Sequence, residues 1–137
     1  MTEISSDEIK VNRGVDKVYT FLKDLRNLKN LMPEDVGGFE ATEEEAQLDL
    51  KGLGKFSISI TDQEENKRIK LTPKGKLPFK FDIEWLLTNN GDNSVVVGRI
   101  NAELNMFMKM MAEPKLRSFL DSQAHKLKDY LESEIQE

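Results

Sequence analysis

One histidine and several acidic clusters are the side chains of this sequence that could carry acid–base chemistry or bind a metal, and cysteine is absent. His125 is of the type used as a general base or a metal ligand. It follows Ala124 in a segment of helical periodicity, where the apolar pattern turns toward solvent, so we expect a surface histidine. A zinc site needs several nitrogen or sulfur ligands, and the chain supplies too few of them. The sequence therefore predicts neither a metal nor a cofactor.

Two acidic runs, Glu43–Glu45 and Glu64–Glu65, are the next candidates for cation binding. Calcium and magnesium take several oxygens from spaced positions, whereas consecutive residues of a strand point to opposite faces. We therefore expect both runs to be solvated turns. The segment Gly52–Gly54 lacks the third glycine and the following helix of a dinucleotide-binding loop, so it is predicted to be a turn or a bulge.

A third acidic group, Asp82 and Glu84, shares one face of a predicted strand, and Arg99 and Glu103 are candidates to lie across from it. Paired carboxylates can do acid–base work when their environments push their pKa values apart. On an outer face they would instead form solvated cross-strand pairs, which is the interpretation adopted here. The sequence thus predicts no catalytic residue.

Length and charge restrict the class of protein. The 137 residues are typical of one domain over 1–137, and the net charge is −5 with an isoelectric point near 5.1. An acidic chain is a poor partner for nucleic acids and for anionic membrane surfaces. Lys74, Lys76 and Lys80 form a loose basic cluster, which we expect to be a solvated loop and strand edge.

The absence of cysteine fits a reducing compartment. Residues 1–10 carry three acids and lack the apolar core of a signal peptide, and no apolar run reaches the length of a membrane span. We therefore expect a cytoplasmic protein without integral membrane contact.

The apolar pattern of the N-terminal third predicts one strand and two short helices. The strand is predicted over 4–13, where Ile9 and Val11 alternate with polar residues. Helical spacing over 15–25 predicts an amphipathic helix. A second helical turn over 28–32 should end at Pro33, because the residue before proline is pushed out of the helical region.

The rest of the chain predicts an antiparallel sheet followed by one long helix. Strands of period two run to about residue 104, with hairpin turns at 62–67 and 89–93 and a loop around 73–78. Pro114 suits the first turn of the last helix, or a kink if that helix starts earlier. The one-sided strands need a cover, and the amphipathic C-terminal helix is the element large enough to provide it.

Several segments resemble the helix-grip superfamily (SRPBCC) of START-like and Bet v 1-like proteins. They are Ile9–Arg13 with Val15–Leu22, Leu31–Glu34, Asn105–Met111, and Pro114–Leu116 with Phe119–Leu120. The resemblance covers nearly the whole chain and is nearest to two branches, the polyketide cyclase/dehydrase-like proteins and the relatives of the G-type subunit of carbon monoxide dehydrogenase. It implies an α+β helix-grip fold, in which a curved antiparallel sheet wraps around a long C-terminal helix and two short helices follow the first strand. Gly14 stands where the family often has proline, and the polar catalytic cluster of the cyclases has no counterpart in this sequence.

The resemblance also implies a cavity between sheet and helix that binds a lipid, a sterol, a polyketide or another apolar molecule. Tyr19, Gln123 and Tyr130 are polar side chains near otherwise apolar helical faces, and are candidate anchors for such a ligand. The full set of predicted ligand contacts is Tyr19, Phe56, Ile58, Leu71, Phe81, Ile83, Trp85, Gly98, Ile100, Met108, Met111, Phe119 and Gln123.

Two features have more than one interpretation. Small residues on the last strand, Gly98 and Ala102, indicate either close approach of the helix or a pocket. The methionine-rich segment Met106–Met111 suits a cavity mouth that adapts to varied ligands, a gap-filled core, or an exposed dimer surface.

Three functions remain open at this point. The first is an intracellular carrier or sensor that binds an apolar small molecule. The second is an enzyme of the polyketide cyclase/dehydrase type, which would need a polar group with a shifted pKa inside the cavity, and the predicted inner faces contain no Asp, Glu, Lys or His. The third is an accessory module that binds a partner protein of a larger assembly or forms a homodimer, which an exposed Met106–Met111 segment would favour.

Overall fold

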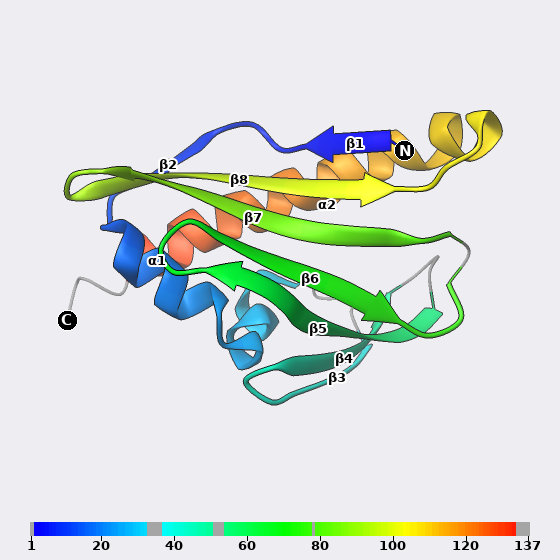
Figure 1. Cartoon of the computed structure of the whole chain (residues 1–137), viewed down its shortest axis with the longest axis horizontal. Coiled ribbons are helices and arrows are strands. Elements are labelled where there is room, and N and C mark those ends of the chain that lie inside the picture. The colour runs from blue at the N-terminus through cyan, green and yellow to red at the C-terminus, as the bar shows by residue number, and fades with distance from the viewer. Residues whose placement is uncertain (1, 33–36, 51–53, 78, 134–137) are drawn as a thin grey trace.

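The computed structural model of the chain describes residues 2–32, 37–50, 54–77 and 79–133. Within these residues, eight strands form one antiparallel sheet in the order β1-β8-β7-β6-β5-β4-β3, and β2 also pairs with β8. A long helix, α2, lies across one face of the sheet, and two short helices lie near one end of it (Figure 1). The predicted α+β helix-grip architecture is confirmed. The elements are β1 Thr2–Ser5, β2 Ile9–Val11, α1 Val15–Leu22, the 3-10 helix η1 Leu25–Leu31, β3 Gly37–Ala41, β4 Glu45–Leu50, β5 Gly54–Glu64, β6 Arg68–Lys74, β7 Phe81–Asn90, β8 Asn93–Ala102 and α2 Met106–Ser133.

The first predicted strand is two strands. Its halves, β1 and β2, both pair with β8, but Ser5 lies opposite Arg99 whereas Ile9 lies opposite Val96. Three residues of the N-terminal segment therefore face two of β8, which is a bulge. The Ser6 hydroxyl accepts a hydrogen bond from the amide of Gly98 at 2.9 Å. This side-chain contact gives the Gly98 amide a partner at the point where regular strand pairing stops.

The first helix ends three residues earlier than predicted, at Leu22, because Asp24 starts a new element. The Asp24 side chain accepts a hydrogen bond from the amide of Arg26 at 3.1 Å and caps η1. Leu25, Leu28 and Leu31 are buried at the three-residue spacing of a 3-10 helix. The predicted stop at Pro33 lies outside the described residues.

The hairpin turns are at the predicted places but are shorter. Strand β5 continues to Glu64, and the turn to β6 includes Asn66 at a φ of 59°. Between β7 and β8, Asn90 pairs with Asn93 around a two-residue turn in which Gly91 has a φ of 71°. Cross-strand pairing thus extends into polar residues that the sequence pattern assigned to turns.

Four further boundaries differ from the sequence-based prediction. Pro73 lies within β6, opposite Ile58, and Phe79 precedes β7. The last strand ends at Ala102, and α2 already starts at Met106, with Pro114 inside the helix. The predicted Gly52–Gly54 turn lies outside the described residues except for Gly54, which begins β5.

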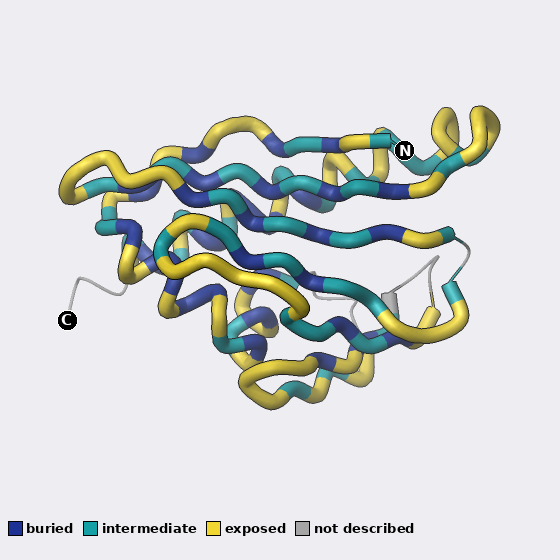
Figure 2. The backbone as a smooth tube through the Cα atoms, in the orientation of Figure 1, coloured by how far each residue is buried: buried dark blue, intermediate teal, exposed yellow. Residues whose placement is uncertain are grey.

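One side of the sheet forms the core with the helices. Helix α2 packs against β1, β2, β8 and η1, while α1 packs against β6, β7 and β8. Buried and exposed residues alternate along the central strands, as the dark and light bands of Figure 2 show. The buried residues of α2 are Leu120, Gln123, Ala124, Leu127 and Leu131.

The C-terminal end of α2 is tied to the segment between β2 and α1. The Glu132 carboxylate accepts hydrogen bonds from the amide of Asn12 at 2.8 Å and from the Lys128 ammonium at 2.6 Å. Arg13 donates to the Glu132 carbonyl at 2.6 Å, which satisfies a carbonyl of the last helical turn. Lys128, and then the Asn12 amide, hold the pKa of Glu132 below its usual range.

We expect Glu132→Gln to lower the melting temperature at pH 7 by about 3 °C, because the ionised carboxylate is lost. A carboxyl whose pKa is depressed by folding stabilises the protein above its unfolded-state pKa, and that stability disappears as the pH falls through the folded-state value. Thermal unfolding at neutral pH and near pH 3 measures this. The difference from wild type should shrink at the lower pH, and Glu8→Gln, on an exposed carboxylate, should show little effect at either. If Glu132→Gln lowered the melting temperature equally at both pH values, the stabilising role of the ionised Glu132 carboxylate would be contradicted.

Candidate ligand-binding site

The strand register brings most of the predicted contact residues onto one continuous inner surface. Ile100 of β8 lies opposite Ile83 of β7, which lies opposite Leu71 of β6, which in turn lies opposite Ile60 of β5. The first three of these side chains are buried. The period of two along each strand had predicted their common face, and the antiparallel register aligns them into a row across the sheet.

The next row of paired residues on the inner face of the sheet is covered by α2. Gly98 lies opposite Trp85, and Trp85 lies opposite Ile69. A methyl group placed on Gly98 would lie 3.1 Å from the Trp85 ring and 3.2 Å from a methyl of Leu120. Of the two interpretations of Gly98, the structure therefore shows close approach, because the indole and Leu120 fill the space above it.

An aromatic cluster lies at the end of the sheet where β7 begins. The rings of Phe56 and Phe81 meet edge to face at a centroid distance of 6.2 Å, and Phe79 lies 5.5 Å from Phe81. Along β7 the exposed fraction rises from 1% at Trp85 to 8% at Ile83 and 9% at Phe81. The inner surface is therefore sealed at its centre and slightly more accessible toward this end.

A hollow of about 410 Å³ opens on strands β3, β4 and β5 near the same aromatic cluster. Buried Leu48 and Phe56 contribute apolar side chains, and Asp49 and Lys55, a cross-strand pair, contribute charge. Five of the eight lining residues are polar or charged, and the register places Gln47, Asp49, Lys55 and Ser57 on the face of the sheet opposite to buried Leu48 and Phe56, so the hollow belongs to the outer face. The hollow is lined by Gly38, Glu40, Gln47, Leu48, Asp49, Lys55, Phe56 and Ser57.

The three candidate anchors occupy different places. Gln123 is 4% exposed on the buried side of α2, and none of the hydrogen bonds of the described residues involves its side chain. Tyr19 is buried on α1 with the Lys23 ammonium 5.9 Å from its ring centroid, and burial, followed by the charge of Glu65, raises the pKa of its phenol. Tyr130 packs against Phe21 at a centroid distance of 5.1 Å. Gln123 is therefore the anchor candidate that combines burial with a place on the inner side of α2, while the buried side-chain atoms without a partner among the described residues belong to Asn93, Ser94 and Arg99.

The remaining predicted contacts lie on the first half of α2. Phe119 and Met108 are half-buried, and Met111 is 58% exposed. Ile58 is buried on β5, opposite Pro73. Phe119 is therefore partly covered, whereas Met111 lies at the surface. The role of each residue as a ligand contact stays a prediction.

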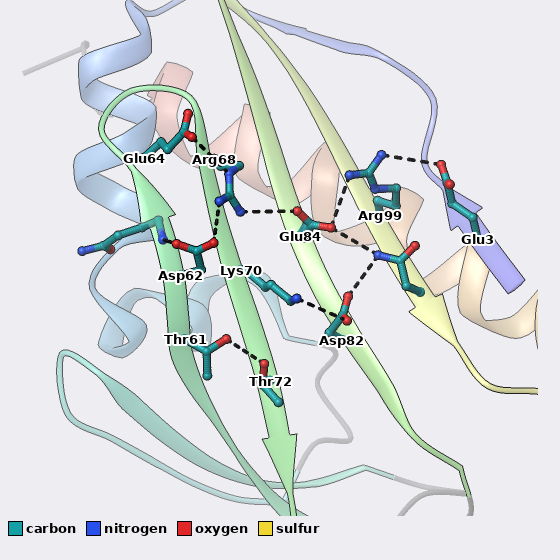
Figure 3. A network of polar contacts seen from close by, with 12 residues as sticks. Glu3, Thr61, Asp62, Glu64, Arg68, Lys70, Thr72, Asp82, Glu84 and Arg99 are labelled. Carbon is teal, nitrogen blue, oxygen red and sulfur yellow. Dashed lines mark hydrogen bonds and ion pairs between the residues drawn. The ribbon is translucent and has the colours of Figure 1, made fainter. Parts of the chain in front are cut away.

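The acids of the central strands lie on the outer face of the sheet, in a network of ion pairs (Figure 3). Glu84 lies directly opposite Arg99, and their side chains pair at 3.2 Å. Asp82 accepts a hydrogen bond from Asn101 at 3.0 Å. The predicted cross-strand pairing is confirmed for Glu84 with Arg99, but the pair is partly buried, with the Glu84 side chain 12% exposed. Glu103 is exposed and contacts the segment before β7 through its backbone amide, which donates to the carbonyl of Lys80.

The network extends from β1 to β5 through two arginines. Arg68 on β6 pairs with Asp62 at 2.5 Å and with Glu84 at 3.8 Å, while Arg99 reaches Glu3 at 3.6 Å. The hydrogen bond from Arg68 holds the pKa of Asp62 below its usual range. A carboxylate such as Asp62, held ionised by an arginine on the outer face, is poorly suited to proton transfer.

The other polar candidates are also at the surface. His125 is exposed, as predicted. Glu43 and Glu44 lie in a turn closed by the amide of Thr42, which donates to the carbonyl of Glu45 at 2.8 Å. Glu45 itself begins β4, so the predicted turn is one residue too long. Among the described residues, no cluster of acids and histidine has the geometry of a metal site.

Sequence reasoning missed two buried hydroxyls. Ser6 is 8% exposed and bonds to Gly98 at the bulge. Ser94 is fully buried on the inner face of β8, and its hydroxyl has no hydrogen-bond partner among the described residues. The alternation of β8 could have identified Ser94, because it stands two residues before Val96 on the same face. Of the described helices, none is both long and apolar enough to span a membrane.

No protein-family model matches the sequence, and no curated protein matches it significantly. Solved structures do match. A START superfamily protein from Mycobacterium smegmatis superposes with a TM-score of 0.77 at 16% identity, covering 96% of this chain and 97% of that one. Truncated norcoclaurine synthase from Thalictrum flavum gives 0.77 at 13% identity, covering 95% and 92%.

A protein of the dynemicin biosynthetic locus gives a TM-score of 0.69 at 17% identity over 95% of this chain, and the chain spans about half of it (47%). At these identities the likeness concerns the fold. It agrees with the arrangement described above, in which an open antiparallel sheet holds one long C-terminal helix and short helices follow the N-terminal strands. The chain therefore has the helix-grip fold of the START-like and Bet v 1-like proteins.

Proposed function

We propose that this protein binds an apolar small molecule, such as a lipid, a sterol or a polyketide-like compound, between the sheet and α2, and acts as a carrier or sensor. The observation that carries the proposal is the composition of the inner surface. Among the described buried residues the polar side chains are Ser6, Ser94 and Gln123, together with the phenol of Tyr19, and the rest are apolar. A surface of this kind binds through area and shape, with few polar contacts to orient the ligand.

The position of Gln123 supports a single polar anchor. A primary amide on the buried side of α2 offers two N–H donors and one carbonyl acceptor to a ligand. A ligand hydroxyl, carbonyl or carboxylate would satisfy them. The slightly higher exposure of Ile83 and Phe81 supports a route to the interior at the end of the sheet where the aromatic cluster lies.

The enzymatic alternative lacks support from the described side chains, because Asp82 and Glu84 lie outside. The interaction-module alternative is favoured by one observation, the exposure of the methionine-rich segment of α2. That surface is compatible with ligand binding in the interior, so the two functions are not exclusive.

The proposal can be tested with cis-parinaric acid, a fluorescent fatty acid whose absorption overlaps tryptophan emission. Trp85 is the single tryptophan and forms part of the inner wall, so binding inside should quench its emission by energy transfer. We expect saturable quenching with one site per chain. Quenching that is absent, or that disappears in a Phe107→Ser/Met110→Ser variant altered only on the surface of α2, would overturn interior binding.

We expect Gln123→Leu to weaken binding of cis-parinaric acid about tenfold, because the carboxylate loses a charge-assisted hydrogen bond. The free energy of unfolding should stay the same or rise, because leucine is similar in size to glutamine and adds apolar side chain to a buried position. The same quenching titration measures the affinity, with Gln63→Leu on an exposed glutamine as the matched control. If Gln123→Leu and Gln63→Leu bound cis-parinaric acid with equal affinity, Gln123 would not be a ligand contact.

A further inference from the structure

The first two turns of α2 expose an unusual set of large apolar side chains. Met106 is 82% exposed, Phe107 72%, Met110 77% and Met111 58%. These four residues, called here the α2 tip, are the large hydrophobic side chains exposed among the described residues. They form the exposed coil at one end of the molecule in Figure 2. Contiguous exposed apolar groups of this size mark a binding surface.

The helix holds these side chains in one stripe. Asn105 caps the helix, its side chain accepting from the amide of Met108 at 2.8 Å. Met106 and Met110 are four residues apart, as are Phe107 and Met111, so the two pairs lie side by side along the helix. At 100° per residue Phe107 and Met111 point away from the buried face of α2, whereas Met106 lies on the same side as buried Ala124. Met106 is exposed because β8 ends at Ala102, which leaves the start of α2 beyond the end of the sheet.

The charge around the α2 tip differs in sign from that of the whole chain. The β6–β7 loop, residues 74–80, carries Lys74, Lys76 and Lys80 and no acid, and residues 103–117 carry three cations against two acids. These two segments together are therefore +4, and exposed Glu3 on β1, opposite Asn101 at the same end of the sheet, lowers the local charge to +3 in a chain of net charge −5. They lie at the same end of the sheet, because the carbonyl of Lys80 accepts from the amide of Glu103 at 2.8 Å (Figure 1).

We propose that the α2 tip and its lysines dock this protein on the surface of an anionic lipid bilayer. Exposed Met and Phe side chains can enter the acyl boundary while Lys109 and Lys115 remain at the headgroups. Each cation near an anionic surface adds attraction that disappears within a Debye length. The negative net charge of the whole chain argued against binding to an anionic membrane. That overall value does not reflect the excess of positive charge near the α2 tip.

Charge also argues against a second copy of this chain as the partner. A symmetric dimer through the α2 tip would bring two segments of the same positive sign together, which opposes association. A bilayer provides both an apolar phase and negative charge. The docking surface includes the end of the sheet that has the aromatic cluster, so a docked protein would present that end to the lipid. Docking itself does not depend on a ligand being bound.

The test is flotation with vesicles of phosphatidylcholine alone and of an equal mixture of phosphatidylcholine and phosphatidylglycerol. We expect binding to the mixed vesicles that weakens with added salt. Phe107→Ser/Met110→Ser should reduce the partition coefficient at least about tenfold, and Lys109→Glu/Lys115→Glu should reduce it by a similar or larger factor. The matched charge control is Lys10→Glu/Lys17→Glu, on exposed residues near the other end of the sheet, which should still float.

Three results would overturn the proposal. The wild-type protein could fail to float with the mixed vesicles. The two lysine variants could lose binding equally, which would mean that overall charge and not the α2 tip is responsible. Finally, analytical ultracentrifugation without lipid could show a dimer that Phe107→Ser/Met110→Ser dissociates, which would assign the tip to self-association. Circular dichroism of each variant confirms that the fold is retained.

Discussion

Replacing Val96 with aspartate should unfold the domain or destabilise it by at least about 4 kcal/mol, whereas the same replacement at Val97 should cost about 1 kcal/mol. The two residues are neighbours on β8. Val96 is fully buried on the inner face, and Val97 is half-buried on the outer face opposite Leu86. Aspartate is close to valine in size, so the difference measures the cost of placing a charge on the inner surface.

Chemical denaturation of both variants measures this contrast. If Val96→Asp does not fold, the isosteric pair Val96→Thr and Val97→Thr provides the same comparison, with an expected difference of about 1–2 kcal/mol from the buried hydroxyl. Equal destabilisation at the two positions would contradict the assignment of faces on β8. It would also remove the basis for an apolar interior beneath the helix.

Gly98→Val should destabilise the protein by about 3 kcal/mol and lower the melting temperature by about 10 °C. A Cβ at Gly98 would lie 3.1 Å from the Trp85 ring and 3.2 Å from Leu120. The centre of a strand cannot move away without breaking its hydrogen bonds, so the indole or α2 must shift instead. Thermal and chemical unfolding of the purified variant measure the loss.

A double-mutant cycle with Gly98→Ala and Trp85→Phe tests the cause. Phenylalanine lacks the two indole carbons nearest to the added methyl, so the pair should be less destabilising than the sum of the single changes. Additive effects would mean that Gly98 is required for a reason other than its contact with Trp85.

The inner and outer faces of the sheet could be predicted from the sequence because each strand alternates strictly. On β7 the residues Phe81, Ile83, Trp85 and Leu87 are all buried, as their period of two indicated. The outer ion pair of Glu84 with Arg99 followed from the same alternation together with the position of the hairpin turn. These features are local, so a single sequence contains them.

Features that depend on distant segments could not be predicted. The break between β1 and β2 arises where Ser6 bonds to Gly98, a contact across 92 residues. Whether Gly98 faced a pocket or a side chain depended on where Trp85 and Leu120 meet it. The exposure of Met110 follows from the end of β8 at Ala102, which leaves the start of α2 beyond the sheet.

Among the candidate anchors, the sequence offered three residues that looked alike. Gln123, Tyr19 and Tyr130 each stand beside apolar residues on a helix. Packing separates them, because Tyr130 meets Phe21, Tyr19 lies beside Lys23 on α1, and Gln123 alone is buried on α2. Helical periodicity gives a face but not the neighbour that occupies it.

Native mass spectrometry of the freshly purified full chain, followed by denaturation and identification of any released compound, tests the central claim most directly. Binding of an apolar molecule between the sheet and α2 predicts a mass above that of the 15.7 kDa chain and a single released class of lipid, sterol or polyketide-like compound. The released compound should then compete with cis-parinaric acid for the interior. A chain at its own mass, combined with no quenching of Trp85 by cis-parinaric acid, would contradict the account.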